Sequence, residues 1–137
     1  MPCSARKVSS DSKFGANPQS AVNSAKQPAP AAAAVADGEL AESHAHWREL
    51  GTANMRFHEA LAGLAGSERV DELMQDVLAE LRLAFLAMDD PRRFHESYLA
   101  RNQQVLARLR ARDGPAAEAL LADYLSDAEQ QLVDAYS

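Results

Sequence analysis

Apolar residues recur every three or four positions along most of the chain after residue 38, which is the period of an α-helix. No alternation of apolar and polar residues indicates a strand. The clearest stripes are Val70, Leu73, Met74, Val77, Leu78, Leu81 and Phe85; Phe94, Tyr98, Val105, Leu106 and Leu109; and Leu120, Leu121, Leu125, Ala128 and Leu132. Because each stripe needs a partner face, the pattern predicts an all-α fold, an antiparallel helical bundle.

Helix start and stop signals divide this region. Gly51-Thr52 and Gly66-Ser67 each resemble a helix end followed by the cap of the next helix. Asp90-Pro91 and Asp113-Gly114-Pro115 each place a capping aspartate before a proline. These signals predict five helices with short connections, over residues 39–50, 52–65, 67–88, 91–112 and 115–136.

The first part of the chain has a different amino-acid composition. Residues 1–37 are rich in Ser, Ala, Asn, Gln and Pro, with Phe14 as their one aromatic residue. Such a segment cannot bury enough apolar surface to offset the entropy lost on ordering. We therefore expect residues 1–37 to be a disordered tail and residues 38–137 to form the folded domain.

Charge and composition narrow the functional class. The net charge is −6, and the residues up to Gly38 hold four basic and two acidic side chains, so the expected domain is acidic. An acidic domain suits the phosphate backbone poorly, so direct nucleic-acid binding is not expected. The one cysteine, Cys3, cannot form an internal disulfide, and no apolar run could span a bilayer. We expect a soluble, cytoplasmic protein without a signal peptide.

Polar side chains interrupt the apolar stripes at a few positions. Asn102 lies one turn after Tyr98 and one turn before Leu106, and Tyr124 lies within the last stripe. Asn54 and His58 share the face of Leu61, and Arg82 borders the stripe of residues 67–88. Buried polar groups without partners cost about 1–3 kcal/mol each, so several together indicate mutual hydrogen bonding or a wet pocket.

Each residue also has a purely structural interpretation. A single histidine on a helix face is more often a satisfied core or rim residue than a ligand. Tyr124 could fill space with its hydroxyl at the surface, and Arg82 could be a surface charge with a buried stem. Asn102 is harder to explain in this way, because asparagine is a poor helix former and costly to bury.

The region from Asn54 to Ala135 resembles the FCD domain, the effector-binding and dimerisation domain of FadR-type GntR transcriptional regulators. Three blocks carry the resemblance, in the family's order and separation: NMRFHEALAGLAGSERVDELM, NQQVLARLRARD and AAEALLADYL. The resemblance implies a FadR C-terminal-domain fold with its first helices missing.

The resemblance also implies a set of site positions. Family members often bind a divalent metal through one Asp and three His, and the metal helps to hold a small carboxylate effector. The matching positions here are Asn54, His58, Asn102 and Tyr124, so only the first histidine is kept. Amide and phenol oxygens are poor ligands for transition metals, and we expect neither a metal nor another cofactor.

The replacements remain polar, which favours a metal-free pocket for a small organic effector. We expect contacts from Asn54, His58, Asn102 and Tyr124, with Arg82 pairing a carboxylate because its guanidinium fits that geometry. His95, two turns before Asn102, and Tyr98 are further candidates.

The chain lacks the pattern of the winged helix-turn-helix that begins these regulators. We therefore expect a homodimeric sensing domain that reaches DNA only through a missing winged-helix domain. The alternative is a ligand-free dimerisation module with a vestigial pocket. An enzyme is the weakest hypothesis, because no nucleophile, base and orienting residue are spaced for catalysis.

Overall fold

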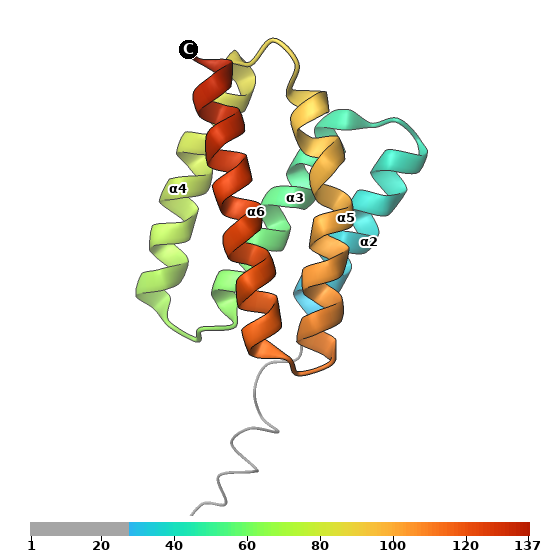
Figure 1. Ribbon diagram of the computed structural model, residues 1–137, viewed down its shortest axis with the longest axis vertical. Helices are drawn as coiled ribbons and strands as arrows, with labels where there is room; N and C mark the ends of the chain where they lie inside the picture. The colour runs from blue at the N-terminus through green and yellow to red at the C-terminus, as the bar shows by residue number, and fades with distance from the viewer. Residues whose placement is uncertain (1–27) are drawn as a thin grey trace, which may run out of the picture.

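Five helices make up the described part of the chain, residues 28–137, in the computed structural model (Figure 1). They are α2 (Ala29–Ser43), α3 (Trp47–Gly63), α4 (Glu68–Ala87), α5 (Pro91–Arg110) and α6 (Gly114–Ala135). The predicted all-α bundle is confirmed. No helix in this part of the chain is both long and apolar enough to cross a membrane.

The last three helices begin where the capping residues predicted. The side chains of Ser67, Asp90 and Asp113 accept hydrogen bonds from the backbone N–H of the third residue of α4, α5 and α6, over 3.4, 3.2 and 3.1 Å. Each bond satisfies one N–H group that the helix cannot satisfy itself.

The predicted helices 39–50 and 52–65 are wrong in their boundaries. The chain reverses between Ser43 and Trp47, where Ala45 has a φ of 55°, and Gly51 lies inside α3. A Cβ on Gly51 would lie 2.9 Å from Nε2 of His95. This glycine therefore permits close packing of an imidazole ring and does not end a helix.

Helix α2 occupies residues that were expected to be disordered. Residues 29–37 are helical, and the helix buries Ala31, Ala34, Val35, Gly38 and Ala41 at helical spacing. Alanine has the highest helix propensity but little hydrophobicity, so its stripe is hard to distinguish from low-complexity sequence. The rest of the expected tail, residues 1–27, lies outside the described residues.

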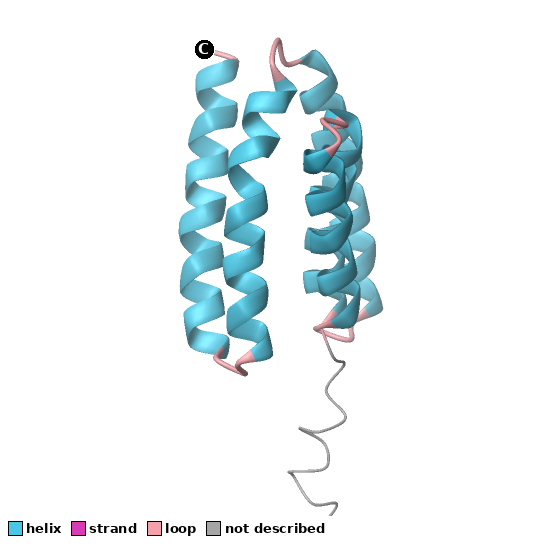
Figure 2. Cartoon of the chain, turned by 90° about the vertical axis from the view of Figure 1, so that its right-hand side faces the viewer, coloured by secondary structure: helices cyan, strands magenta, loops and turns pink. Residues whose placement is uncertain are grey.

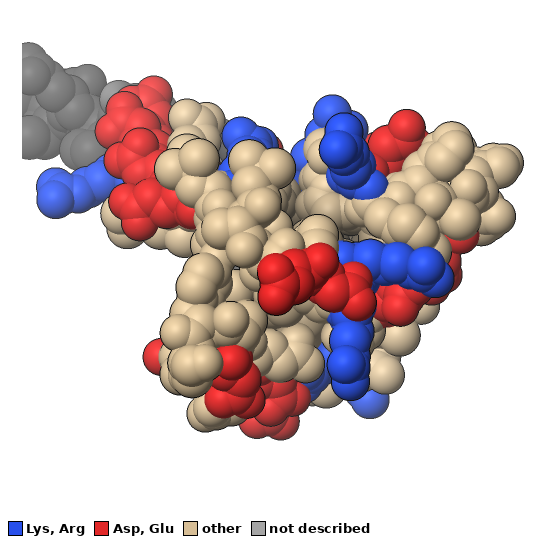
Figure 3. All heavy atoms as spheres, turned by 90° about the horizontal axis from the view of Figure 1, so that it is seen from above, with Lys and Arg blue, Asp and Glu red and all other residues tan. Residues whose placement is uncertain are grey.

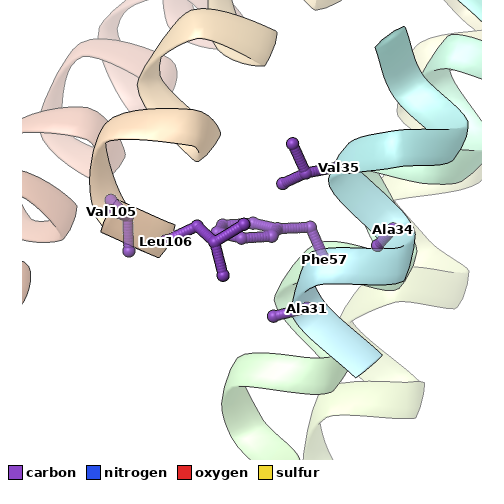
Figure 4. Close-up of a cluster of buried hydrophobic side chains, with 6 residues drawn as sticks. All are labelled: Ala31, Ala34, Val35, Phe57, Val105 and Leu106. Atoms are coloured by element: carbon purple, nitrogen blue, oxygen red, sulfur yellow. The ribbon is translucent and has the colours of Figure 1, made fainter. Parts of the chain in front are cut away.

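The helices form two layers (Figure 2). One layer is the α5–α6 hairpin, and the other contains α2, α3 and α4 with α3 at its centre. Phe57 of α3 is fully buried and packs between Ala31, Ala34 and Val35 of α2 and two residues of α5, Val105 and Leu106 (Figure 4). This cluster joins the two layers.

Helix α4 is less completely covered. Within the described chain its backbone comes close mainly to α3. Three residues that were expected in the core, Val70, Leu73 and Val77, are 39%, 63% and 43% exposed. The apolar face of α4 therefore extends beyond the core and forms part of a cavity wall described below.

The position of α2 can be tested by placing a charge in it. Ala31 is 1% exposed, so we expect Ala31→Asp to lower the free energy of unfolding by about 3–5 kcal/mol, the usual cost of an unpaired buried charge. Urea denaturation followed by circular dichroism measures this change. Ala33→Asp is the matched control, because Ala33 is exposed on the same helix. Equal stabilities of the two variants would contradict the packing of α2.

Candidate ligand-binding site

Side chains from three helices converge between the two layers. Asn54 and His58 lie one turn apart on α3, Asn102 comes from α5, and Tyr124 comes from α6. Asn54 Oδ1 accepts hydrogen bonds from Asn102 Nδ2 over 2.7 Å and from the Tyr124 hydroxyl over 3.0 Å. His58 Nε2 lies 2.8 Å from the same hydroxyl oxygen. The structure thus brings together the four positions to which the resemblance pointed.

The directions of these hydrogen bonds follow from the donors available. Since the Tyr124 hydroxyl donates to Asn54, its oxygen is left to accept from His58 Nε2–H. The amide nitrogen of Asn54 faces Nδ1 of His95 over a long 3.5 Å. That contact places the His95 proton on Nε2. We call the hydrogen-bonded set of His58, Tyr124, Asn54, Asn102 and His95 the polar network.

Burial keeps the polar network uncharged near neutral pH. Desolvation lowers the pKa of His58 and of His95 from the ordinary 6.5 to about 4. Burial raises the pKa of the Tyr124 hydroxyl, and the hydrogen bond to Asn54 opposes this only in part. Tyr124 is therefore a phenol and the histidines are neutral imidazoles at pH 7.

These residues do not fit the metal that the family resemblance implies. A zinc or nickel ion needs several imidazole, thiolate or carboxylate ligands, and the four positions supply one imidazole. Asn54 Oδ1 already accepts two hydrogen bonds, and the pKa of Tyr124 is too high for a phenolate ligand. No cluster of three His, Cys, Asp or Glu side chains suited to a metal occurs within residues 28–137.

One atom of the polar network has no partner. Asn102 Oδ1 is buried and accepts no hydrogen bond from any described residue, although Asn102 Nδ2 is satisfied. An unsatisfied buried carbonyl costs about 1–3 kcal/mol. The side chains of the polar network therefore satisfy one another's hydrogen bonds except at this oxygen.

A cavity of about 580 Å³ opens on one side of the polar network, between α3, α4 and α6. We call it the apolar cavity. Most of its wall is aliphatic or aromatic, and its polar lining residues are Asn54, His58, Tyr124 and Glu129. Met74, Val77 and Leu81 of α4 form part of the opposite wall. Three members of the polar network thus face an otherwise apolar space.

A second cavity, of about 700 Å³, lies between α3, the end of α4 and the start of α5. Arg48, Arg82, Arg92 and His95 line it, and we call it the arginine cavity. Arg82 therefore lies beside His95 and not in the apolar cavity with His58 and Tyr124. The single pocket expected from the sequence is two cavities in the structure.

The remaining candidates are buried. Tyr98 is 1% exposed, its ring centre lies 4.6 Å from that of Tyr124, and its hydroxyl donates to Gln131 over 3.0 Å. Neither Tyr98 nor Asn102 lines the two cavities. Ligand contacts by any of the candidate residues remain predictions.

Sequence reasoning missed Trp47, Arg48 and Arg92 of the arginine cavity. On α3, Arg48, Thr52 and Met55 recur at helical spacing and line this cavity together. The sequence did not reveal this spacing, because the expected helix boundary at Gly51 assigned Arg48 to one helix and Thr52 and Met55 to the next.

The fold is an all-α bundle with two cavities beside a buried polar network, and comparison assigns the chain to a family. The chain belongs to the FCD domain family, whose model matches residues 21–127. FCD domains are parts of transcriptional regulators, where they bind effectors and mediate dimerisation, and they are not an enzyme family. The resemblance inferred from the three sequence blocks is confirmed.

A solved structure agrees with this assignment. The chain is similar to a GntR protein from Rhodococcus sp. RHA1 that is described as a transcriptional regulator, with 41% identity and a TM-score of 0.76. The match covers 86% of this chain and 59% of that chain. This chain therefore spans little more than half of the matched regulator. Comparison with curated proteins gives no match.

The polar network predicts how much the hydroxyl group of Tyr124 contributes to the free energy of unfolding. Tyr124→Phe removes the donor to Asn54 and the acceptor for His58, so we expect a loss of about 1–3 kcal/mol in the free energy of unfolding. Urea denaturation measures it. Tyr136→Phe serves as the control, because it removes a hydroxyl that makes one exposed hydrogen bond, to the Ala84 carbonyl, and a smaller loss is expected. A Tyr124→Phe variant as stable as this control would argue against the network.

The buried histidines predict a pH dependence. Because their pKa values fall from 6.5 to about 4 on folding, the unfolded chain binds protons more readily between these values. The stability that each contributes is complete above pH 6.5 and is lost as the pH falls toward 4. The loss is at most about 3 kcal/mol per histidine. Denaturation curves of His95→Gln should show a weaker pH dependence than those of the wild type, and an unchanged pH dependence would contradict a buried neutral ring.

Proposed function

We propose that this FCD domain is the sensing and dimerisation part of a GntR-type transcriptional regulator, and that a small organic effector binds in the apolar cavity. The observation that carries the proposal is the meeting of Asn54, His58 and Tyr124 at the wall of that cavity. A volume of about 580 Å³ lies within the usual range of ligand pockets. A few polar groups in an apolar wall are typical of sites that orient a small molecule.

The lining indicates the chemistry of the effector. Neither Lys nor Arg lines the apolar cavity, His58 is neutral at pH 7, and Glu129 would repel an anion. A carboxylate there would lose its hydration without gaining a cation. We therefore propose an effector with an apolar body and an uncharged hydrogen-bonding head directed at His58 and Tyr124. The earlier expectation of a carboxylate depended on Arg82, which lines the other cavity.

The proposed output is a change in DNA binding. Because the matched regulator is longer than this chain, DNA contact would come from a winged-helix domain outside the aligned region. Binding in the apolar cavity would fix the spacing of α4 and α6, two helices whose backbones pack mainly against different neighbours, α4 against α3 and α6 against α5. A homodimer of the domain would pass that change to the two DNA-reading units.

A second candidate function is supported by the polar network itself. Asn54, His58 and Tyr124 satisfy one another, so the fold does not need a ligand to stabilise them. This observation favours a ligand-free dimerisation module with a vestigial pocket. Such a module would be recognised by a Tm that small molecules do not change.

Thermal unfolding with uncharged probes tests the proposal. We expect alcohols and primary amides with six to ten carbons to raise the Tm by several degrees at saturating concentration, since binding to the native state alone stabilises it. Ala128→Phe, which would fill the cavity from α6, should abolish the shift. Ala122→Phe adds the same ring at an exposed position of α6 and should keep it.

Two results decide between the candidates. If the probes raise the Tm of Ala128→Phe as much as that of the wild type, the apolar cavity is not the effector site. No shift with any probe, together with a dimer in sedimentation velocity, would favour the ligand-free module.

A further inference from the structure

The turn between α2 and α3 carries two histidines, one on each side of Ala45. His44 follows the last residue of α2, and His46 precedes the first residue of α3. Because the chain reverses here, with a φ of 55° at Ala45, the two imidazole rings come together. Their centres lie 5.7 Å apart, and their planes are inclined by 33°. The turn lies at the upper right of Figure 1.

A hydrogen bond fixes one nitrogen of each ring. His44 Nδ1 donates to the Leu40 carbonyl over 2.9 Å, because a carbonyl oxygen can only accept. His46 Nδ1 donates to Glu49 Oε2, also over 2.9 Å. Each Nδ1 therefore carries a proton, and the neutral form of each ring has its lone pair on Nε2. Within residues 28–137, neither Nε2 atom has a hydrogen-bond partner.

Both Nε2 atoms are directed away from the bundle. Leu40 lies one turn back along α2, Glu49 lies one turn forward along α3, and these two helices pack side by side below the turn. Since Nδ1 of each ring points back toward its own helix, the opposite edge of the ring, with Nε2, faces solvent. Both histidines are exposed, so an ion can reach these atoms without any change in the fold.

This arrangement is typical of histidines that bind metals. Such histidines almost always donate their other ring N–H to a backbone carbonyl or a carboxylate, which fixes the tautomer and directs the free nitrogen. His44 has the carbonyl, and His46 has the carboxylate. Two imidazoles on one tetrahedral ion have ring centres roughly 5 Å apart, given a metal–nitrogen distance of about 2 Å. A small rotation of either exposed side chain would close the observed 5.7 Å to this value.

The charge around the turn favours a cation. Within residues 39–49, three carboxylates accompany one arginine. Figure 3 looks onto this end of the molecule and shows carboxylates, in red, exposed on it. Imidazole nitrogen suits Zn²⁺, Ni²⁺ and Cu²⁺, whereas Mg²⁺ and Ca²⁺ prefer oxygen ligands.

From these observations we propose that His44 and His46 form a binding site for a divalent transition-metal ion, with water completing its coordination. The two Nε2 atoms are the ligands, and Glu49 is a positioning residue that holds the His46 ring. A bound ion would join the end of α2 to the start of α3. Neither His44 nor His46 lines the apolar cavity or the arginine cavity, so the site does not depend on the effector proposed above.

Tryptophan fluorescence offers a direct test, because Trp47 follows His46 and is the one tryptophan of the chain. The full chain, without a histidine tag, is titrated with Ni²⁺ at pH 7.5, with Mg²⁺ as the control ion. Two ligands supply about half the binding free energy of a four-ligand zinc site, so we expect saturable quenching with a Kd of roughly 1–100 μM. Mg²⁺ should cause no change, because it prefers oxygen ligands.

Matched variants assign the binding to the turn. His44→Gln and His46→Gln should each weaken Ni²⁺ binding by at least about tenfold, since each removes one of two ligands. Both positions are exposed, so circular dichroism should show an unchanged helix content. Cys3→Ser removes the one thiol of the chain and should leave the affinity for Ni²⁺ unchanged.

Nitrogen-15 NMR with Zn²⁺, which is diamagnetic, identifies the ligand atoms. The Nε2 signals of His44 and His46 should shift together, whereas those of the buried His58 and His95 should not. Any of three results would overturn the proposal. Ni²⁺ could give no saturable quenching, it could bind both histidine variants as tightly as the wild type, or its binding could be lost in Cys3→Ser.

Discussion

The side-chain amide of Asn54 holds the centre of this domain together. Its oxygen accepts from Asn102 of α5 and Tyr124 of α6, while its nitrogen faces His95, so one residue of α3 ties both layers of the bundle. An amide can do this because it offers an acceptor and donors at once without carrying charge. A carboxylate at the same position would need a cation or several donors to be buried.

The polar network separates two spaces of opposite chemistry. His58 and Tyr124 border the apolar cavity, and His95 borders the arginine cavity. Because burial keeps both histidines neutral, neither cavity receives charge from the network. Charge comes from Glu129 at the apolar cavity and from arginines of α3, α4 and α5 at the arginine cavity. The four positions at which the resemblance implied metal ligands thus hold an uncharged, hydrogen-bonded set of side chains between the two cavities.

Much of the fold could be predicted from the sequence, because aspartate and serine caps and strong Leu stripes mark α4, α5 and α6. Helix α2 could not, since an alanine stripe carries little apolar signal, and Gly51 was mistaken for a helix end because its neighbour His95 is distant in sequence. Helical period and family resemblance together pointed to Asn54, Asn102 and Tyr124, which contact one another in the structure, and their binding of a ligand stays a prediction. They grouped Arg82 with these residues, whereas Arg82 lines the arginine cavity. Spacing along one helix does not tell which of two neighbouring cavities a side chain at the edge of its apolar stripe will line.

Nitrogen-15 NMR of the histidine rings tests the central claim most directly. At pH 7, we expect neutral imidazoles protonated on Nε2 for both His58 and His95, with the His58 nitrogens unchanged by an equimolar addition of Zn²⁺. A charged His58 ring, a proton on its Nδ1, or a shift of its nitrogens on adding Zn²⁺ would contradict the uncharged, metal-free network.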